Sequence, residues 1–203
     1  MKTLFAPALA LVSTVALCSC TMTTQTVPGR SATEELTISA ATDRAAEKLA
    51  ASLTVGGSVY VDATYFDAPD AKYAIGSIRA AIARHGTRLS ADRAKADRVV
   101  EIRAGTLTID QNKFLIGIPE FSFPIPVTGV VTFPEIAIYS FHDNQGVAKF
   151  AATEITQSDG QLVVAPPPEY AYSHNEKRTA MIFIQWSHQD YIDEKDQDPE
   201  DKK

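Results

Sequence analysis

The side chains most often used for metal binding and acid–base catalysis are few and scattered in this sequence. The four histidines are His85, His142, His174 and His188. None of them lies in the H-x-x-x-H, H-E-x-x-H or cysteine–histidine spacings that arrange ligands around zinc. His188 and Asp190 are close in sequence, but they would bind a metal only with a third converging ligand, so no metal site is predicted.

Motifs for nucleophilic catalysis and phosphate binding are absent from the sequence as well. No serine stands in the G-x-S-x-G pattern, and the glycines form neither a G-x-G-x-x-G motif nor a P-loop. Asp62, Glu101 and Glu135 could in principle pair as general acid and base, but any domain of this size contains such sets. Glu101 and Arg103 are expected to form a surface ion pair. No catalytic or cofactor-binding residue is therefore predicted.

One site with a defined covalent chemistry stands near the N-terminus. Lys2 precedes an apolar run of 14 residues, 4–17, which is too short for a bilayer core that requires roughly 20 helical residues. Length and flanks therefore predict a secretory signal. At its end Leu17 stands three residues before Cys20, and Ser19 stands one before it.

This spacing resembles the bacterial lipoprotein signal, which implies cleavage before Cys20, a diacylglycerol thioether on its thiol and an acylated amine. Cys18 is a poor alternative because the bulky Leu17 directly precedes it. The competing interpretation is an ordinary signal with an accidental cysteine. Thr21, rather than an aspartate, follows Cys20, and by resemblance to enterobacterial sorting this favours the outer membrane.

Composition narrows the classes of partner. Cleavage before Cys20 would leave 184 residues with 18 basic and 25 acidic side chains, a formal net charge of −7. This length fits one domain with a proper core. The chain has no basic stripe, so neither nucleic acid nor electrostatic attraction to anionic lipid is expected. With Cys18 removed and Cys20 acylated, the domain would have no disulfide and no thiol nucleophile.

Apolar periodicity predicts the regular elements of the first half. Polar residues 20–31 are expected to form a flexible tether. Helices are predicted over 32–52 and 71–84, and strands over 58–66 and 98–110. The order strand, helix, strand predicts a βαβ-like unit.

The strand over 98–110 carries an irregularity. Val100 and Ile102 point to one face, whereas Leu107 and Ile109 have the opposite parity. Burying both pairs on one face requires an inserted residue, and we predict a β-bulge near Gly105.

The second half predicts antiparallel strands. Asp143-Asn144-Gln145-Gly146 is a hairpin signal between strands expected over 135–141 and 147–155. Residues 179–187 are apolar on both parities, as in a central strand, and residues 189–203 are expected to form an acidic, disordered tail. The predicted fold is α+β over residues 32–188: an N-terminal helix, a βαβ-like unit, then antiparallel strands forming one mixed sheet.

The stretch 114–133 is apolar, contains three prolines and has Glu120 as its single charge. Prolines disfavour a central strand or a regular helix, and they lower the entropy cost of ordering a loop on binding. If exposed, its side chains would form a patch that indicates a partner or a membrane contact; if they fold over the sheet, they are core. The candidate binding residues are Ile118, Phe121, Phe123, Ile125 and Val127.

Four further segments resemble an uncharacterised, domain-of-unknown-function family of bacterial lipoproteins. They are Thr23–Arg30, Val99–Gly105, Leu115–Pro119 and Gly146–Phe150. The resemblance extends over about Cys20 to Trp186. It implies no activity, because none of the four segments is a mechanistic motif.

These observations leave three hypotheses. The first is a non-enzymatic envelope lipoprotein, anchored through Cys20 on the periplasmic side of the outer membrane, that binds or supports an envelope protein. The second is a hydrolase of envelope polymers with a carboxylate pair in a cleft. The third is a lipid or glycolipid carrier, which requires an apolar cavity.

Overall fold

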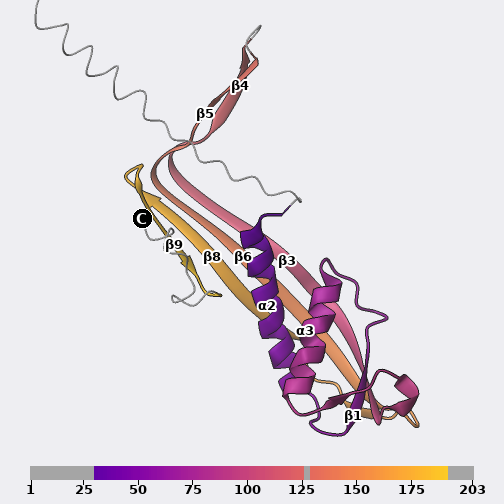
Figure 1. Cartoon of the computed structure of the whole chain (residues 1–203). Coiled ribbons are helices and arrows are strands. Elements are labelled where there is room, and N and C mark those ends of the chain that lie inside the picture. Colours follow the sequence, from indigo (N-terminus) through magenta and orange to yellow (C-terminus); the bar gives the residue numbers. More distant parts are fainter. Residues whose placement is uncertain (1–29, 126–128, 192–203) are drawn as a thin grey trace, which may run out of the picture. The chain divides into compact units, whose positions relative to one another are not determined.

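The structure is a computed structural model that describes residues 30–125 and 129–191 (Figure 1). The chain divides after Ser31, and the account below concerns the unit that begins at Ala32. The predicted signal peptide (1–19), the lipidation site Cys20, most of the tether, Val127 and residues 192–203 of the tail lie outside the described residues.

The predicted mixture of helices with a mixed sheet is confirmed. The helices are α2 (Ala32–Ala51) and α3 (Ala71–Arg84), with a 3-10 turn, η1 (Arg93–Lys95). The strands are β1 (Ser58–Asp62), β2 (Arg88–Leu89), β3 (Arg98–Ile118), β4 (Phe121–Ile125), β5 (Gly129–Phe133), β6 (Ile136–Thr156), β7 (Leu162–Val164), β8 (Glu169–Ala180) and β9 (Ile184–Gln189).

Seven of these strands form one mixed sheet in the order β2-β1-β3-β6-β8-β9, with β7 paired to β6. β1 runs parallel to both β2 and β3, and α3 lies between β1 and β2 in the chain. All other pairs in this sheet are antiparallel. The sequence predicted one sheet, but β4 and β5 form a second, two-stranded sheet inserted between β3 and β6.

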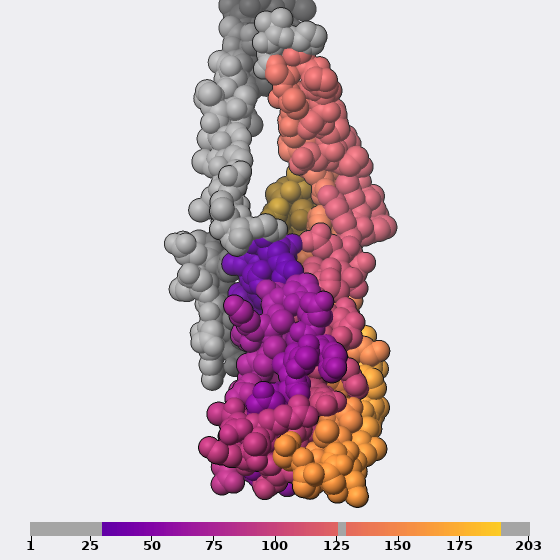
Figure 2. Space-filling view, turned by 90° about the vertical axis from the view of Figure 1, so that its right-hand side faces the viewer, coloured from indigo at the N-terminus to yellow at the C-terminus, as the bar shows by residue number. Residues whose placement is uncertain are grey.

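The two helices lie side by side over the same face of the larger sheet (Figure 1). Their buried residues are mainly small: Ala41, Ala45 and Ala46 of α2 are fully buried. Small side chains let a helix approach a sheet closely and fill the interface without voids. In Figure 2 the surfaces of the helices (indigo to purple) meet that of β3 without a visible opening.

The predicted β-bulge is confirmed. The pairing between β3 and β6 shifts register between Ala104 and Thr106, so Gly105 is the inserted residue. The shift restores the helix-facing side of the strand: Ile102 before it and Leu107 after it are both buried in the same core. A single inserted residue thus keeps two sets of opposite parity on one face.

Gly146 was predicted to end a hairpin turn, and that prediction is wrong. β6 runs through residues 143–146 without interruption, and Gly146 pairs with Ile109 on one side and Ser173 on the other. A Cβ at this position would lie 2.6 Å from the carbonyl oxygen of Thr37 in α2 and 2.7 Å from Ser173 Oγ. The glycine is needed for the close approach of helix to strand, not for a turn.

An ion pair whose carboxylate is fully buried joins the other end of α2 to the sheet. Glu154 in β6 has no exposed surface, and its Oε1 lies 2.5 Å from Arg98 Nη1. The backbone N–H of Thr54, just after α2, donates to Glu154 Oε2 at 3.1 Å. Removing one partner of a buried pair leaves an uncompensated charge, so this contact fixes the helix position along the strand.

The C-terminal strands also differ from the prediction. Residues 179–187 are not one central strand, because the chain reverses at Met181–Phe183 between β8 and β9. The first residues of the tail expected over 189–203 are held by the domain: Gln189 ends β9, and Asp190 Oδ2 accepts from Arg44 Nη1 of α2 at 2.8 Å.

We expect Gly146→Ala to lower the free energy of unfolding by about 2 kcal/mol, because the added methyl group forces α2 away from β6. Urea unfolding measures the change. Gly76→Ala is the matched control: this exposed glycine in the middle of α3 has no atom within 4 Å of the added carbon. That substitution should raise stability by about 0.5–1 kcal/mol. Equal effects of the two variants would contradict the proposed close approach.

Candidate interaction surface

The helices cover only part of the two longest strands. β3 and β6 have 21 residues each. In β3 the buried positions end at Leu107, and none of the residues 110–118 is buried. The first turn of α2 contacts this region where Gln111 Nε2 donates to Glu34 Oε1 at 2.7 Å. Beyond Gln111 the side chains of β3 are therefore mostly exposed, whereas its partner β6 still has buried positions at Ala137, Ser140 and Asp143.

This uncovered region is rich in exposed apolar side chains, which we call the apolar end. Its members belong to the last residues of β3, the β4–β5 sheet, the first residues of β6, the β8–β9 connection and β9. They are Phe114, Ile116, Ile118, Phe121, Phe123, Val130, Phe133, Ile136, Ile138, Met181, Ile182, Phe183, Ile184 and Trp186. Such a concentration exceeds the scattered apolar residues normal for a surface.

The β4–β5 sheet is a hairpin with two different faces. Phe121 pairs with Phe133 and Phe123 with Val131, so these side chains share one face. The rings of Phe121 and Phe133 stack at 5.0 Å, and those of Phe123 and Phe133 at 5.7 Å. On the other face Ser122 and Thr132 join their hydroxyl groups at 2.7 Å. Pro124 fits because β5 is the single strand paired with β4, so no second partner needs its missing N–H.

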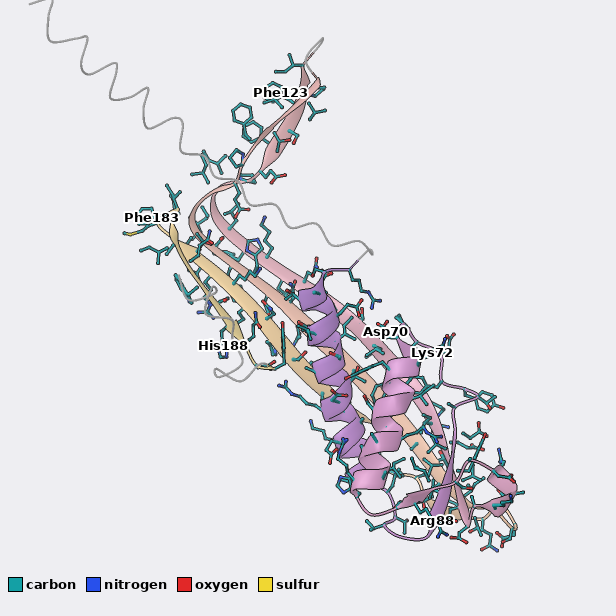
Figure 3. The ribbon with its side chains drawn as sticks, in the orientation of Figure 1. Asp70, Lys72, Arg88, Phe123, Phe183 and His188 are labelled. Atoms are coloured by element: carbon teal, nitrogen blue, oxygen red, sulfur yellow. The ribbon has the colours of Figure 1, made fainter. Side chains whose placement is uncertain are left out.

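The structure places the sequence-predicted binding residues as follows. Ile118, Phe121 and Phe123 are 50%, 46% and 42% exposed, so they are surface rather than core. Ile125 is half-buried, and Val127 is outside the described residues. Figure 3 shows Phe123 on the hairpin and Phe183 on the β8–β9 connection. A role of these residues in binding a partner stays a prediction.

The turn between β8 and β9 was not predicted from the sequence. Met181 and Ile182 have φ of 51° and 72°, in the left-handed region that disfavours branched side chains. Their backbone N–H groups donate to the carbonyl oxygens of Ile138 and Ala137 at 2.8 and 2.9 Å. Phe183 is 79% exposed. No glycine or asparagine marks this reversal, so nothing in the local sequence distinguished it from a continuous strand.

A shallow concavity lies on the face of the sheet opposite the helices. Its volume is about 270 Å³, and it is lined by Glu176, Arg178, Trp186 and His188 (His188 is labelled in Figure 3). Arg178 donates to Glu176 at 2.8 Å and lies over the ring of Phe141 at 5.1 Å. Because the guanidinium of Arg178 is already paired with Glu176, the concavity has little net charge, and Trp186 supplies an aromatic wall.

The carboxylates do not assemble into an acid–base pair. The hydroxyl and backbone N–H of Thr64, followed by Arg93, hold the pKa of Asp62 below its usual value, which is opposite to the need of a general acid. Glu135 is bound to Lys113 at 2.6 Å, and Arg103 donates to Thr153 rather than to Glu101.

Two carboxylates do become neighbours, a pairing that the sequence did not predict. Asp143 and Glu176 lie opposite each other on β6 and β8. Both already have a cationic or imidazole partner, since Asp143 lies 3.4 Å from His174 Nδ1 and Glu176 binds Arg178. Asp190 accepts from the backbone N–H of His174 at 3.0 Å and from Arg44 Nη1 at 2.8 Å.

Residues 30–125 and 129–191 contain no group of three histidine, cysteine, aspartate or glutamate side chains arranged to hold a metal. No helix in the same part of the chain is long and apolar enough to cross a bilayer.

The fold and surface thus define a mixed α/β domain with an uncovered apolar end. The model of a family of unknown function, DUF6655, matches residues 14–164, and the chain belongs to this family. The resemblance to a domain-of-unknown-function family is confirmed at that level. The match includes the β4–β5 hairpin and ends at β7, before β8 and β9. No curated protein matches the chain.

We expect Ile182→Asn to raise the free energy of unfolding by about 1 kcal/mol, because asparagine tolerates the left-handed backbone that isoleucine resists. Ile184→Asn is the matched control, since Ile184 is also exposed but lies in β9, where asparagine is unfavourable. Urea unfolding of both variants decides the point. A loss of stability in both would show that the Ile182 side chain contributes more contact than its backbone costs.

Proposed function

We propose that the chain is a non-enzymatic lipoprotein of the bacterial cell envelope, anchored through acylated Cys20 and acting by binding through its apolar end. The observation that carries this proposal is the exposure of Ile118, Phe121 and Phe123, which lie at the end of β3 and in β4, beyond the part of the sheet that the helices cover. A surface of this kind favours a binding partner over free exposure to water.

The proposed anchor is supported by the sequence around Cys20. Leu17 and Ser19 precede the cysteine at lipoprotein-signal spacing, and an apolar run comes before them. One acyl chain binds a membrane only reversibly, whereas two or more give stable attachment. Thr21 in place of aspartate favours the outer membrane, with the domain in the periplasm.

The charges beside the apolar end favour binding over catalysis. Lys113 and Glu135 neutralise each other at 2.6 Å, and Arg178 and Glu176 do so at 2.8 Å. The carboxylates of Asp143 and Glu176 lie on facing positions of β6 and β8 beside the concavity, where a hydrolase could use them. Asp143 is already paired with His174 and Glu176 with Arg178. Such pairs are common among polar side chains that stabilise the surface of a sheet.

Cys20→Ser tests the anchor, because serine has no thiol to form the thioether. We expect the variant to move from the membrane fraction to the soluble fraction and to lose incorporation of labelled fatty acid. Cys18→Ser is the matched control and should remain membrane-bound. Retention of the Cys20→Ser chain in the membrane would rule out acylation of this residue as the anchor.

A photo-crosslinking amino acid at Phe123 in living cells tests the surface. We expect adducts, to protein or to lipid, that mass spectrometry identifies, because Phe123 is exposed on the apolar face of the hairpin. The matched position is Leu162, which is exposed but lies in β7. If Phe123 gives no adduct, or the same adducts as Leu162, the apolar end is not the binding surface.

A further inference from the structure

We propose that the apolar face of the β4–β5 hairpin contacts the acyl-chain region of the bilayer that holds the anchor, giving the domain a second membrane contact. This proposal rests on the proposed anchor at Cys20 and specifies what covers the apolar end.

The composition of the hairpin fits lipid. Residues 121–125 and 129–133 contain no charged side chain. One face presents Phe121, Phe123 and Phe133 in a stacked row. The opposite face carries the paired hydroxyl groups of Ser122 and Thr132 beside the smaller apolar pair Pro124–Val130. A two-faced element of this kind lies at an interface with its apolar face in the hydrocarbon and its polar face toward water.

The apolar face of the hairpin also requires a packing partner. An isolated two-stranded sheet is marginally stable in water and usually requires packing of its apolar face. Among the described residues the hairpin pairs only with itself. The second apolar element, Met181–Phe183, is held at Ala137 and Ile138 of β6, next to the Ile118–Ile136 pair from which the hairpin extends.

The length of chain outside the structure permits this contact. Twelve residues, 20–31, connect Cys20 to α2, and a fully extended chain of that length spans about 40 Å. The first turn of α2 is fixed to Gln111. From Gln111 to Ile125 the strand path is at most about 46 Å. The anchor and the hairpin therefore reach comparable distances from the same point of the domain.

Lipid fits this surface better than a protein partner does. The hairpin offers no charge or free hydrogen-bond donor on its apolar face that would select a particular protein. The chain has a formal net charge of −6, so attraction to anionic headgroups cannot supply the contact. Burial of the apolar rings in hydrocarbon requires neither a specific polar contact nor electrostatic attraction.

Tryptophan quenching tests the proposal. Trp186 is the single tryptophan, so Trp186→Phe gives a background without intrinsic signal. Phe123→Trp or Leu162→Trp is then introduced into the full chain, purified in its acylated form and reconstituted into phosphatidylcholine vesicles with brominated acyl chains. Leu162 is the matched control because β7 pairs with β6 at Glu154 and Ile155, at the opposite end of the ladder.

We expect several-fold stronger quenching and a blue-shifted emission for Phe123→Trp than for Leu162→Trp. Phe121→Trp, on the same face of the hairpin, should behave like Phe123→Trp and replaces it if that variant does not fold. Equal or absent quenching in chains that float with the vesicles would overturn the bilayer contact while leaving the anchor intact. A discrete protein adduct in cells without quenching in vesicles would assign the surface to a protein. Failure to float would instead reject the anchor on which the proposal rests.

Discussion

The difference in length between a helix and a strand of equal residue number governs this domain. α2 has 20 residues and extends about 30 Å, whereas β3 and β6 have 21 residues each and extend about 70 Å. A helix of this size can cover less than half of the ladder on one face. The sequence fills the remainder with exposed apolar side chains rather than polar ones. The core and the apolar end therefore both follow from the difference in length between α2 and the two long strands.

In the half of the ladder that the helices cover, close packing depends on small side chains rather than on large ones. Gly146 and the alanines of α2 bring two backbones together, and the Ser173 hydroxyl donates to the Thr37 carbonyl in the same contact. Glu154 and Arg98 then fix the far end of the helix. Because close packing near one end of α2 is combined with an ion pair at the other, α2 has one position along the strands, and this position sets where its N-terminus meets β3.

The sequence predicts the parts of this structure that depend on local periodicity. The isoleucines of α3 and the parity change around Gly105 were sufficient for a helix and a bulge. It fails where tertiary contacts override local signals: Asp143–Gly146 has the composition of a turn, but Gly146 serves the approach of α2. The reversal at Met181 has the composition of a strand, and only the hydrogen bonds to Ala137 and Ile138 explain it. The candidate surface was found from prolines and missing charge, whereas its exposure required the structure.

The ladder between β3 and β6 also acts as a spacer whose length can change in defined steps. The β6–β8 pairing begins at Tyr139, and pairs inserted on the hairpin side of that residue would leave the helix-covered core in place. Two residues added to each strand would move the hairpin about 7 Å farther from α2 and keep every side chain on its face. One residue added to each strand would turn the aromatic row to the opposite side. Relatives of this domain are therefore free to differ in reach by even numbers of residue pairs, and the second register shift, between Ile116 and Gly117, is a point where such a change can be absorbed.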